Sequence, residues 1–347
     1  MNSTDLIDSL SEPDPFYVTI RHLHHVYEYL LATISFSLNG CVVYLAVTTR
    51  NPTMKNYCWV LLMSVAGDMI YTSLNFLSMM IVEIRAGKMW FITTGPFIHS
   101  GYPYNMLMSS LYLSGMYVTI MTIMVQFVYR YEVLCKNTTS MKKFFKLYAL
   151  GIIWSVVQGF LTWPCFDPPS EEDTAILKSH PMYTFDTPTY VNGDVKNLST
   201  MIHFTSSQVV IILLYVVVVI TGRRIHKVLN SEQVKMSKNT RDAQSKLTTV
   251  MLLQATYPGI IVGTPVFIGC GMAQMKMDVL WSGMYFVTSI SFIPIANALT
   301  VLLVIPSFRR RIFRKTGRKL TDSSGVSARS IGESVDRRRP SEAYAMS

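Results

Sequence analysis

The chain has 347 residues, half of them hydrophobic (AVILMFWYC), and only 15% carry a charge. Its mean hydropathy is +0.30. This balance excludes an ordinary soluble globular protein and is typical of a membrane protein. The formal net charge of +10 comes from clustered basic residues, which suit anionic lipid and protein partners, and nothing in the pattern supports a nucleic-acid partner.

Seven long stretches of the chain hold almost no charged residues. About 20 apolar residues cross a hydrocarbon core of roughly 30 Å, so each stretch is long enough for one transmembrane helix. The sequence therefore predicts an all-α membrane protein, a seven-transmembrane helix bundle within residues 27–305. Its helices are expected at about 27–49, 57–83, 104–134, 147–166, 202–222, 246–273 and 280–305.

The distribution of Lys and Arg predicts the orientation of the bundle. Segments on one side hold 25 of the 31 basic residues, and the basic side of a membrane protein faces the cytoplasm. The N-terminal residues 1–26 are therefore expected outside the cell, and the C-terminus inside it. Residues 306–320 are typical of an amphipathic juxtamembrane helix. Residues 321–347 are rich in Ser, Gly and Arg and are typical of a disordered cytoplasmic tail.

Short motifs indicate covalent modification. The sequons at Asn2 and Asn197 lie on the predicted outer side and are candidate glycosylation sites, although so short a pattern also arises by chance. Ser330 and Ser341 follow arginines in the tail and are candidate phosphorylation sites, with an inert tail as the alternative. Cys165 and Cys270 lie near outer helix ends, where they could form a disulfide or remain free thiols.

Asp68 interrupts the second stretch, at a depth where a charged carboxylate costs roughly 2.5–3.5 kcal/mol. It must therefore face the interior of the bundle, where Asn39 of the first helix and Asn297 of the seventh are its expected polar partners. Two interpretations remain open. The network could be an ion- or proton-linked switch that rearranges, or a static hydrogen-bonded strut.

Proline interrupts the last two predicted helices. Pro258 and Pro265 lie in the sixth and Pro294 lies in the seventh. Each proline removes one backbone hydrogen bond and permits a kink, so the cytoplasmic half of the sixth helix could pivot. The alternative is that proline is simply tolerated in these membrane helices.

The outer half of the third predicted helix carries Met, Tyr and Asn side chains at helical spacing. Counting outward from Arg130 in steps of three and four residues places them toward the interior of the bundle. Such residues would form an apolar cavity for a small, weakly polar molecule, and ordinary helix packing is the alternative. No Asp or Glu lies on this stretch, so a counter-ion for an amine is not evident. The candidate pocket residues are Asn105, Met108, Tyr112, Met116 and Tyr117.

Several local motifs resemble, in order, those of the nematode serpentine chemoreceptors of the Str superfamily, which are seven-transmembrane G-protein-coupled receptors. The motifs are "RNPTMKNY" (50–57) before the helix with Asp68, "FVYRYEVL" (127–134), Gln254 four residues before Pro258, and "PIANALTVLLVIPSFRR" (294–310). "TGPF" and the Tyr-Arg-Tyr sequence resemble class d, whereas the end of the seventh helix resembles classes h and i. The class, among d, h, i, j and r, therefore stays open.

The resemblance implies a chemosensory receptor, not an enzyme, which binds an odorant or soluble cue in the outer half of the bundle and activates a heterotrimeric G protein. It implies no cofactor. Further implied partners are membrane lipid, a receptor kinase and an arrestin-type protein, which would recognise Ser330 and Ser341. The expected location is the plasma membrane, as a multi-pass protein at the cilium of a sensory neuron.

Arg130 closes a run of 41 uncharged residues. By resemblance to the Asp/Glu-Arg-Tyr motif of rhodopsin-like receptors, Arg130 with Tyr129 and Tyr131 would hold the resting bundle closed and then face the G protein, while Pro258 and Pro294 permit the switch. Tyr129 replaces the acid of that motif, so an ionic lock to the preceding residue is absent. The alternative is an arginine that only anchors the helix end at the lipid surface.

Other function classes lack the residues that they need. Residues 279–308 contain no lysine to carry retinal, and an intramembrane protease lacks a second deep carboxylate beside Asp68. The histidines at 22, 24 and 25 have no Cys or carboxylate at clear ligand spacing, so no metal site is predicted. A proton- or solute-coupled transporter remains the alternative function, although no internal repeat is evident.

Overall fold

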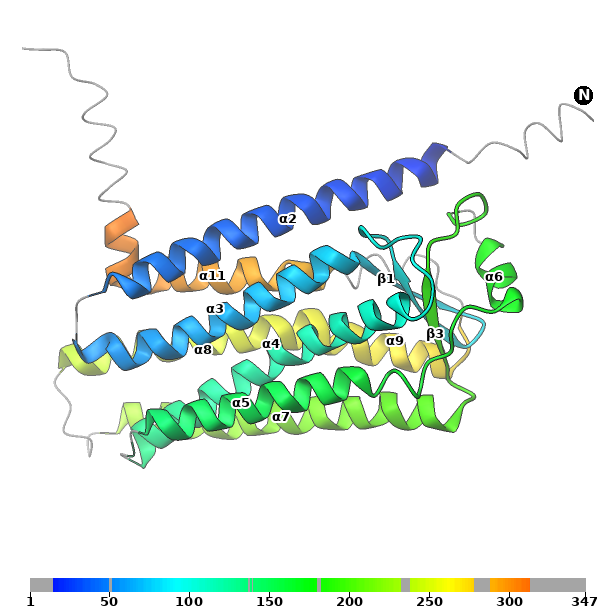
Figure 1. Ribbon diagram of the computed structural model, residues 1–347. Coiled ribbons are helices and arrows are strands. Elements are labelled where there is room, and N and C mark those ends of the chain that lie inside the picture. The colour runs from blue at the N-terminus through cyan, green and yellow to red at the C-terminus, as the bar shows by residue number, and fades with distance from the viewer. Residues whose placement is uncertain are drawn as a thin grey trace, which may run out of the picture.

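The computed structural model describes residues 15–49, 52–136, 138, 140–179, 182–231, 238–277 and 288–312. These residues form an elongated bundle of long helices with a small sheet at one end (Figure 1). The bundle helices are α2 (Pro15–Val47), α3 (Pro52–Ser78), α4 (Tyr104–Cys135), α5 (Met141–Phe160), α7 (Leu198–Asn230), α8 (Lys238–Pro258), α9 (Thr264–Gln274) and α11 (Ile293–Val304). A π-helical turn, η1 (Gly259–Gly263), joins α8 to α9, so the two form one broken rod.

Four helices of the described chain are long and apolar enough to cross a membrane by themselves: Phe16–Val47, Tyr57–Ser78, Tyr104–Cys135 and Leu198–Asn230. A fifth span results if Thr288–Val304 is joined to the short helix Pro306–Ile312, which turns away from it by 90°. The outer surfaces agree with a lipid environment. Leu150 and Ile153 of α5 are 62% and 60% exposed, and Leu213 of α7 is 57% exposed, apolar area that a bilayer would cover.

Several helices differ in length from the predicted ones. α2 begins at Pro15, inside the segment expected as an extended N-terminus. α3 ends at Ser78 because Met79 adopts a φ of 39°, which no α-helix continues, so residues 79–83 are not its last turn. α7 and α8 both reach well into the segment expected as a third inner loop. In α2, α7 and α8 polar or charged residues thus extend the helix beyond its apolar run.

The expectation of an all-α protein is wrong at one end of the bundle, which we call the sheet end. There β1 (Met80–Arg85), β2 (Lys88–Thr93) and β3 (Tyr190–Asp194) form an antiparallel sheet in the order β1-β2-β3. Ala86 and Gly87 make the hairpin turn with φ of 53° and 73°, and two successive left-handed residues match the strand twist. The apolar residues of β1 directly extend the apolar run of α3, so hydropathy alone does not separate them.

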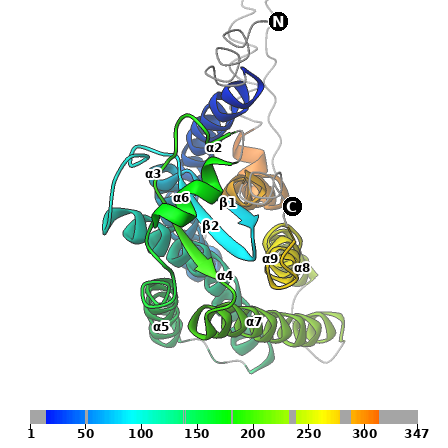
Figure 2. The same cartoon turned by 90° about the vertical axis from the view of Figure 1, so that its right-hand side faces the viewer.

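The two faces of the sheet pack against different partners, because successive strand residues point to opposite sides. Figure 2 looks onto the sheet end and shows the strands across the bundle with α6 (Glu171–Lys178) in front of them. The outer face buries Ile81, Trp90 and Ile92 against Leu177 and Tyr183. The inner face joins the core of the bundle through Ile84, Met89 and Phe91.

α4 is the central helix. Its most apolar window is 78% buried, against 33% for α7, and it contacts α3, α5, α7 and α8. Because α4 runs from the sheet end to the other end, which we call the opposite end, it connects any site beneath the sheet with the loops between the helices at the far side (Figure 1).

Candidate functional site

A cavity of about 90 Å³ lies beneath the sheet, between α4, α7 and α9. A cavity of about 150 Å³ holds benzene, so these walls admit only a small molecule unless they move. The sheet supplies Val82, Ile84, Met89 and Phe91, and α4 supplies Tyr112, Leu113, Met116 and Tyr117. The remaining lining residues are His203, Phe204, Ser207, Ile211, Gly269, Cys270 and Ile290.

Three of the five candidate pocket residues line this cavity, namely Tyr112, Met116 and Tyr117. The other two lie elsewhere. Asn105 is buried and its Nδ2 donates to the Tyr190 carbonyl at 3.0 Å, which ties α4 to β3. Met108 is buried in helix packing outside the cavity lining. Three of the predicted residues thus lie on the face of α4 that lines the cavity, and the two nearer the N-terminus of α4 lie outside the cavity lining.

One cavity wall is held by a chain of hydrogen bonds between three helices. Tyr117 Oη donates to Ser207 Oγ of α7 at 2.8 Å, and Gln158 Nε2 of α5 donates to the same oxygen at 3.0 Å. Ser207 in turn donates to the His203 carbonyl at 2.8 Å. These bonds satisfy the polar groups of an otherwise apolar wall, so the wall is fixed in position before any ligand arrives.

A buried carboxylate beside the cavity escaped the sequence reasoning. Glu28 of α2 is 2% exposed, and its two oxygens accept hydrogen bonds from Asn75 Nδ2 at 2.7 Å and Ser291 Oγ at 3.0 Å. The cluster therefore joins α2, α3 and the start of the seventh helix. Glu28 lies at the start of the first predicted helix, 27–49, just before the uncharged run that begins at residue 29, and no role was predicted for it. α2 begins more than three turns earlier, at Pro15, so Glu28 lies well inside a helix.

The intramembrane polar network forms in part as predicted. Asn297 Nδ2 donates to both oxygens of Asp68, at 3.0 and 3.3 Å, and both side chains are buried. Gln254 of α8, which had been noted only for its spacing to Pro258, donates to the Asn297 carbonyl at 3.4 Å. Asn39 instead donates to the Ser35 carbonyl of its own helix at 3.0 Å, so no hydrogen bond between Asn39 and Asp68 is described.

Arg130 lies at the opposite end of α4 and is only 4% exposed. Its Nη2 donates to Gln244 in the first turns of α8, to the side-chain Oε1 at 2.8 Å and to the carbonyl at 3.1 Å. This burial disfavours the alternative of an arginine anchored at the lipid surface. Gln244 was missed because the segment around it was assigned to a basic loop.

The two tyrosines beside Arg130 hold α4 to other helices. The Tyr129 ring lies 4.9 Å from that of Phe144 in α5, centroid to centroid. Tyr131 Oη accepts a hydrogen bond from Arg224 Nη1 of α7 at 2.9 Å. Successive residues of the Tyr-Arg-Tyr sequence therefore contact α5, α8 and α7, which makes this segment the junction of the opposite end.

The proline-containing helices are irregular at the predicted places. Pro258 is the last residue of α8, and the π-helical turn follows it directly. Pro294 lies in the first turn of α11, which follows a break at Phe292. Pro265 lies in the first turn of α9. A π-helical turn has a looser backbone than an α-helix, so the rod of α8 and α9 has its weakest point level with the middle of the bundle.

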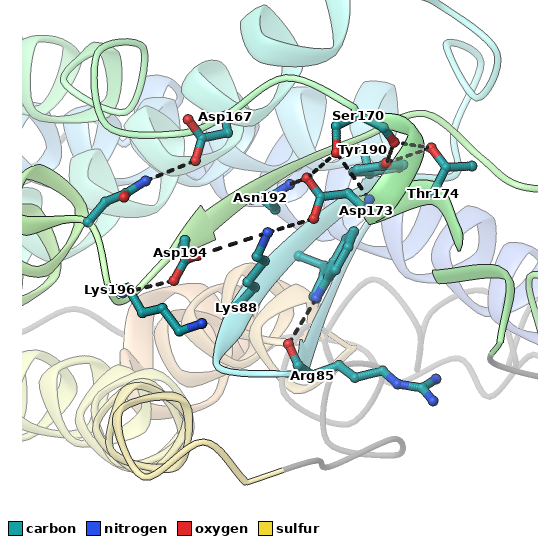
Figure 3. A network of polar contacts seen from close by, with 12 residues as sticks. Arg85, Lys88, Asp167, Ser170, Asp173, Thr174, Tyr190, Asn192, Asp194 and Lys196 are labelled. Atoms are coloured by element: carbon teal, nitrogen blue, oxygen red, sulfur yellow. Dashed lines mark hydrogen bonds and ion pairs between the residues drawn. The ribbon is translucent and has the colours of Figure 1, made fainter. Parts of the chain in front are cut away.

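A polar network clamps the outer face of the sheet to α6 (Figure 3). Lys88 Nζ lies 2.6 Å from Asp173 Oδ1 and 3.9 Å from Asp194 Oδ2. Burial raises the pKa of Asp173, but hydrogen bonds from Lys88, Ser170 and Asn192 outweigh it and hold the pKa below its usual range. The network therefore keeps Asp173 ionised and the sheet fixed over the cavity.

A second carboxyl group behaves in the opposite way on the same face. Glu83 of β1 is 4% exposed, and its Oε1 accepts a hydrogen bond from Tyr183 Oη at 3.1 Å. Burial raises the pKa of Glu83 to about 8, although Tyr183 and the nearby Arg85 lower it. The outer face of the sheet therefore packs around two carboxyl groups of opposite behaviour: that of Asp173, on α6, is stabilised as the anion, and that of Glu83, on β1, is stabilised as the neutral acid.

The remaining predicted sites are distributed as follows. Cys165 and Cys270 are free thiols, so the possible disulfide is not formed. Asn197 is exposed at the start of α7, and its Nδ2 donates to Asp167 Oδ2 at 3.1 Å. Within the part of the chain that the structure describes, no group of three or more His, Cys, Asp or Glu could hold a metal ion. Asn2, Ser330 and Ser341 lie outside the described residues.

Comparison with known proteins agrees with this geometry. Residues 24–314 match the family described as "Serpentine type 7TM GPCR chemoreceptor Srd". Two Caenorhabditis elegans proteins are similar over most of the chain. "Serpentine receptor class delta-19" is 20% identical and "Serpentine receptor class delta-18" is 22% identical, each over 83% of this chain and over 86% and 87% of their own lengths respectively.

The crystal structure of squid rhodopsin superposes with a TM-score of 0.60 at 13% identity, over 88% of this chain and 87% of that one. At this identity the likeness shows the fold alone, which is a rhodopsin-like seven-transmembrane fold and mostly helical. The family match resolves the receptor class that the motifs left open. It also identifies the chain as a multi-pass membrane protein of a receptor family, not an enzyme. The chain therefore belongs to the Srd family, class delta, of the serpentine seven-transmembrane chemoreceptors.

Proposed function

We propose that this Srd-family chain is a chemosensory G-protein-coupled receptor whose ligand, an odorant or soluble cue, binds in the cavity beneath the sheet. The observation that carries the proposal is the course of α4. Its Tyr112 and Met116 line the cavity, and its Arg130 lies at the opposite end, bonded to Gln244 of α8. One buried helix thus connects a small-molecule cavity with the surface that contacts the G protein.

The proposed orientation follows from charge. Described residues at the opposite end include Lys143, Arg224 and Arg309, and the sequence places most of its Lys and Arg in the loops on that side. The sheet end and the N-terminus therefore face outside, and the opposite end and the C-terminus face the cytoplasm. We place the receptor in the plasma membrane of a sensory-neuron cilium, with a kinase and an arrestin-type protein acting on Ser330 and Ser341 of the tail.

In the proposed mechanism, ligand binding shifts the bundle toward an open state, which requires that the ligand bind this state better than the closed one. A ligand that fills the cavity presses on Gly269 and Cys270 of α9. The π-helical turn after Pro258 lets α8 move separately from α9, and this motion withdraws Gln244 from Arg130. The freed guanidinium of Arg130 then faces the G protein.

The test is nucleotide exchange on a heterotrimeric G protein in cells that express the receptor, screened against volatile and water-soluble small molecules. We expect a response in the wild type that is lost in Met116→Trp, which fills the cavity, and in Arg130→Ala, which removes the guanidinium. Leu150→Ala, on the exposed face of α5, is the matched control and should respond normally.

Two outcomes would overturn the proposal. A response that survives Met116→Trp unchanged would place the ligand site elsewhere. Uptake of a solute without nucleotide exchange, unaffected by Arg130→Ala, would support the alternative of a transporter. Surface levels of all variants are matched before comparison, so that loss of folding is not read as loss of signalling.

A further inference from the structure

The polar cluster around Glu28 has more hydrogen-bond acceptors than donors. Asn75 Nδ2 and Ser291 Oγ donate to the carboxylate, and Asn75 Nδ2 also donates to Ser291 Oγ at 3.0 Å. Three further buried oxygens, Asn75 Oδ1, Tyr71 Oη and Tyr112 Oη, have no hydrogen bond of good geometry among the described residues, although the two tyrosine hydroxyls lie close enough to interact with each other. Buried polar atoms are rarely left in this condition, so the cluster is incomplete as it stands.

The cluster is continuous with the cavity. Tyr112 lines the cavity, and its ring lies 6.2 Å from that of Tyr71, centroid to centroid. Both tyrosines are close enough to Glu28 to feel its charge. Ile290 lines the cavity, and the next residue, Ser291, bonds Glu28. A molecule in the cavity therefore contacts Tyr112, which lies beside Tyr71, and Ile290, whose neighbour Ser291 bonds the carboxylate.

The carboxylate also lacks an opposite charge. The ion pairs among the described residues involve other acids, namely Glu132, Asp173, Asp186 and Asp194. His24 lies one turn earlier on α2, and neither of its ring nitrogens bonds Glu28. An ionised group buried without a partner is strongly unfavourable, so a cation that enters here gains both the charge and the unused acceptors.

We infer that Glu28, Tyr71, Asn75, Tyr112 and Ser291 form a subsite for the protonated amino group of a small organic amine whose apolar part fills the cavity. An ammonium group has three N–H donors and no acceptor, which matches a carboxylate flanked by unpartnered oxygens. The faces of the two tyrosine rings favour a cation as well. The inference rests on the proposed function, because it takes the cavity as the ligand site. Glu28 would supply, from α2, the counter-ion for an amine that α4 lacks.

The test uses two probes of the same shape, cyclopentylamine, which is protonated at neutral pH, and cyclopentanol, which is neutral. The full-length receptor in lipid nanodiscs is titrated with each probe, and the shift of its unfolding midpoint gives the dissociation constant. We expect Glu28→Gln to weaken amine binding by at least about tenfold and alcohol binding by less than about twofold. Tyr71→Phe and Tyr112→Phe should each weaken the amine selectively, by less.

Glu83→Gln is the matched control, because Glu83 is an equally buried carboxyl at the sheet end that does not line the cavity. It should leave both affinities unchanged. Amine binding that is insensitive to Glu28→Gln would overturn the inference. So would the lack of any shift with primary amines from methylamine to cyclohexylamine, which would leave the cluster as a purely structural, water-filled one. If Glu28→Gln does not fold, the two tyrosine variants decide.

Met116→Trp separates this inference from the proposed function. If it abolishes binding of cyclopentanol while the amine shows no dependence on Glu28, the cavity is the ligand site and only the amine subsite is wrong. If it leaves the binding of both probes unchanged, the cavity itself is not the ligand site, and the proposed function fails with the inference.

Discussion

Arg130 and Gln244 lie opposite each other at the junction of α4 and α8, with Arg130 Nη2 2.8 Å from Gln244 Oε1. The partner of the guanidinium in this bond is a neutral amide oxygen. The residue before the arginine, Tyr129, does not supply an acid either. A hydrogen bond to a charged group contributes about 1.5–3 kcal/mol, less than a buried ion pair loses when one partner is removed. In the proposed mechanism, the closed bundle is therefore held by a bond of moderate strength.

Replacing Gln244 by Ala should raise basal nucleotide exchange. The variant loses the side-chain acceptor but keeps the carbonyl, which accepts from the same nitrogen at 3.1 Å. A loss of about 1.4 kcal/mol from the closed state corresponds to a roughly tenfold larger open fraction. The measurement is ligand-free exchange at matched surface levels. Ser245→Ala, at an exposed neighbouring position, is the control, and equal basal rates in the two variants would contradict the prediction.

Replacing Asn297 by Ala should lower the free energy of unfolding by about 1–3 kcal/mol, because Asp68 is left buried without its donor. The check is the unfolding midpoint of the purified receptor. Thr300→Val is the matched control, since the Thr300 hydroxyl bonds only the Ala296 carbonyl of its own helix. The same variants decide between a switch and a strut. A strut loses stability alone, whereas a switch also changes basal exchange.

The helical part of the fold could be predicted because a bilayer requires it. A backbone in hydrocarbon must satisfy its own hydrogen bonds, so each uncharged run long enough to span had to be a helix. The pair of Asp68 and Asn297 follows from the same physics, since a polar group at that depth needs a partner inside the bundle.

The sheet end could not be predicted in this way. In hydrocarbon the backbone must satisfy its own hydrogen bonds, but outside the hydrocarbon this requirement does not decide between strand and helix. The run Met80–Arg85 is as apolar as a helix end, and only the left-handed residues Met79 and Ala86 mark it as a strand. The ends of helices were also hidden, because charged residues extend α2 and α8 beyond their apolar runs. For this reason we missed the role of Glu28, which lies well inside α2 and not at its start, and the role of Gln244, in the first turns of α8.

Replacing Asp173 by Ala should loosen the sheet over the cavity. Asp173 pairs with Lys88 and also accepts from Asn192 at 3.0 Å. The pair is partly exposed, so we expect a loss of about 1 kcal/mol. Hydrogen exchange of the β2 amides measures it. Glu172→Ala, an exposed acid on the same turn of α6, is the control, and equal exchange in both variants would argue against the clamp.

The carboxyl group of Asp173 also predicts that the sheet loses stability at acidic pH. The pKa of Asp173 is held below its usual value in the folded state. Its contribution is therefore present above the pKa of the unfolded chain and is lost as the pH falls through the folded-state pKa. In the wild type, protection of the β2 amides should decrease at acidic pH, and in Asp173→Asn this part of the decrease should be absent.

Glu83 predicts a dependence of stability on pH that has the opposite sign. Its pKa is about 8 in the folded protein, against 4.5 for the free side chain, mainly because burial disfavours the anion. Between these two values the folded state binds more protons than the unfolded one. The free energy of unfolding of the sheet should therefore decrease with rising pH, by at most about 1.4 kcal/mol per pH unit, and level off above the folded-state pKa.

Two variants check that Glu83 is the cause. Glu83→Gln cannot ionise, so its β1 and β2 amides should keep the same protection across this range. Tyr183→Phe removes the hydroxyl that stabilises the anion, so its folded-state pKa rises further and the decrease extends to higher pH. A pH profile in Glu83→Gln that is identical to the wild type would assign the decrease to another group. The Asp173 contribution is lost at strongly acidic pH, and the Glu83 contribution declines from about pH 4.5 to about 8, so the cover of the cavity should be most stable under mildly acidic conditions, between the two ranges.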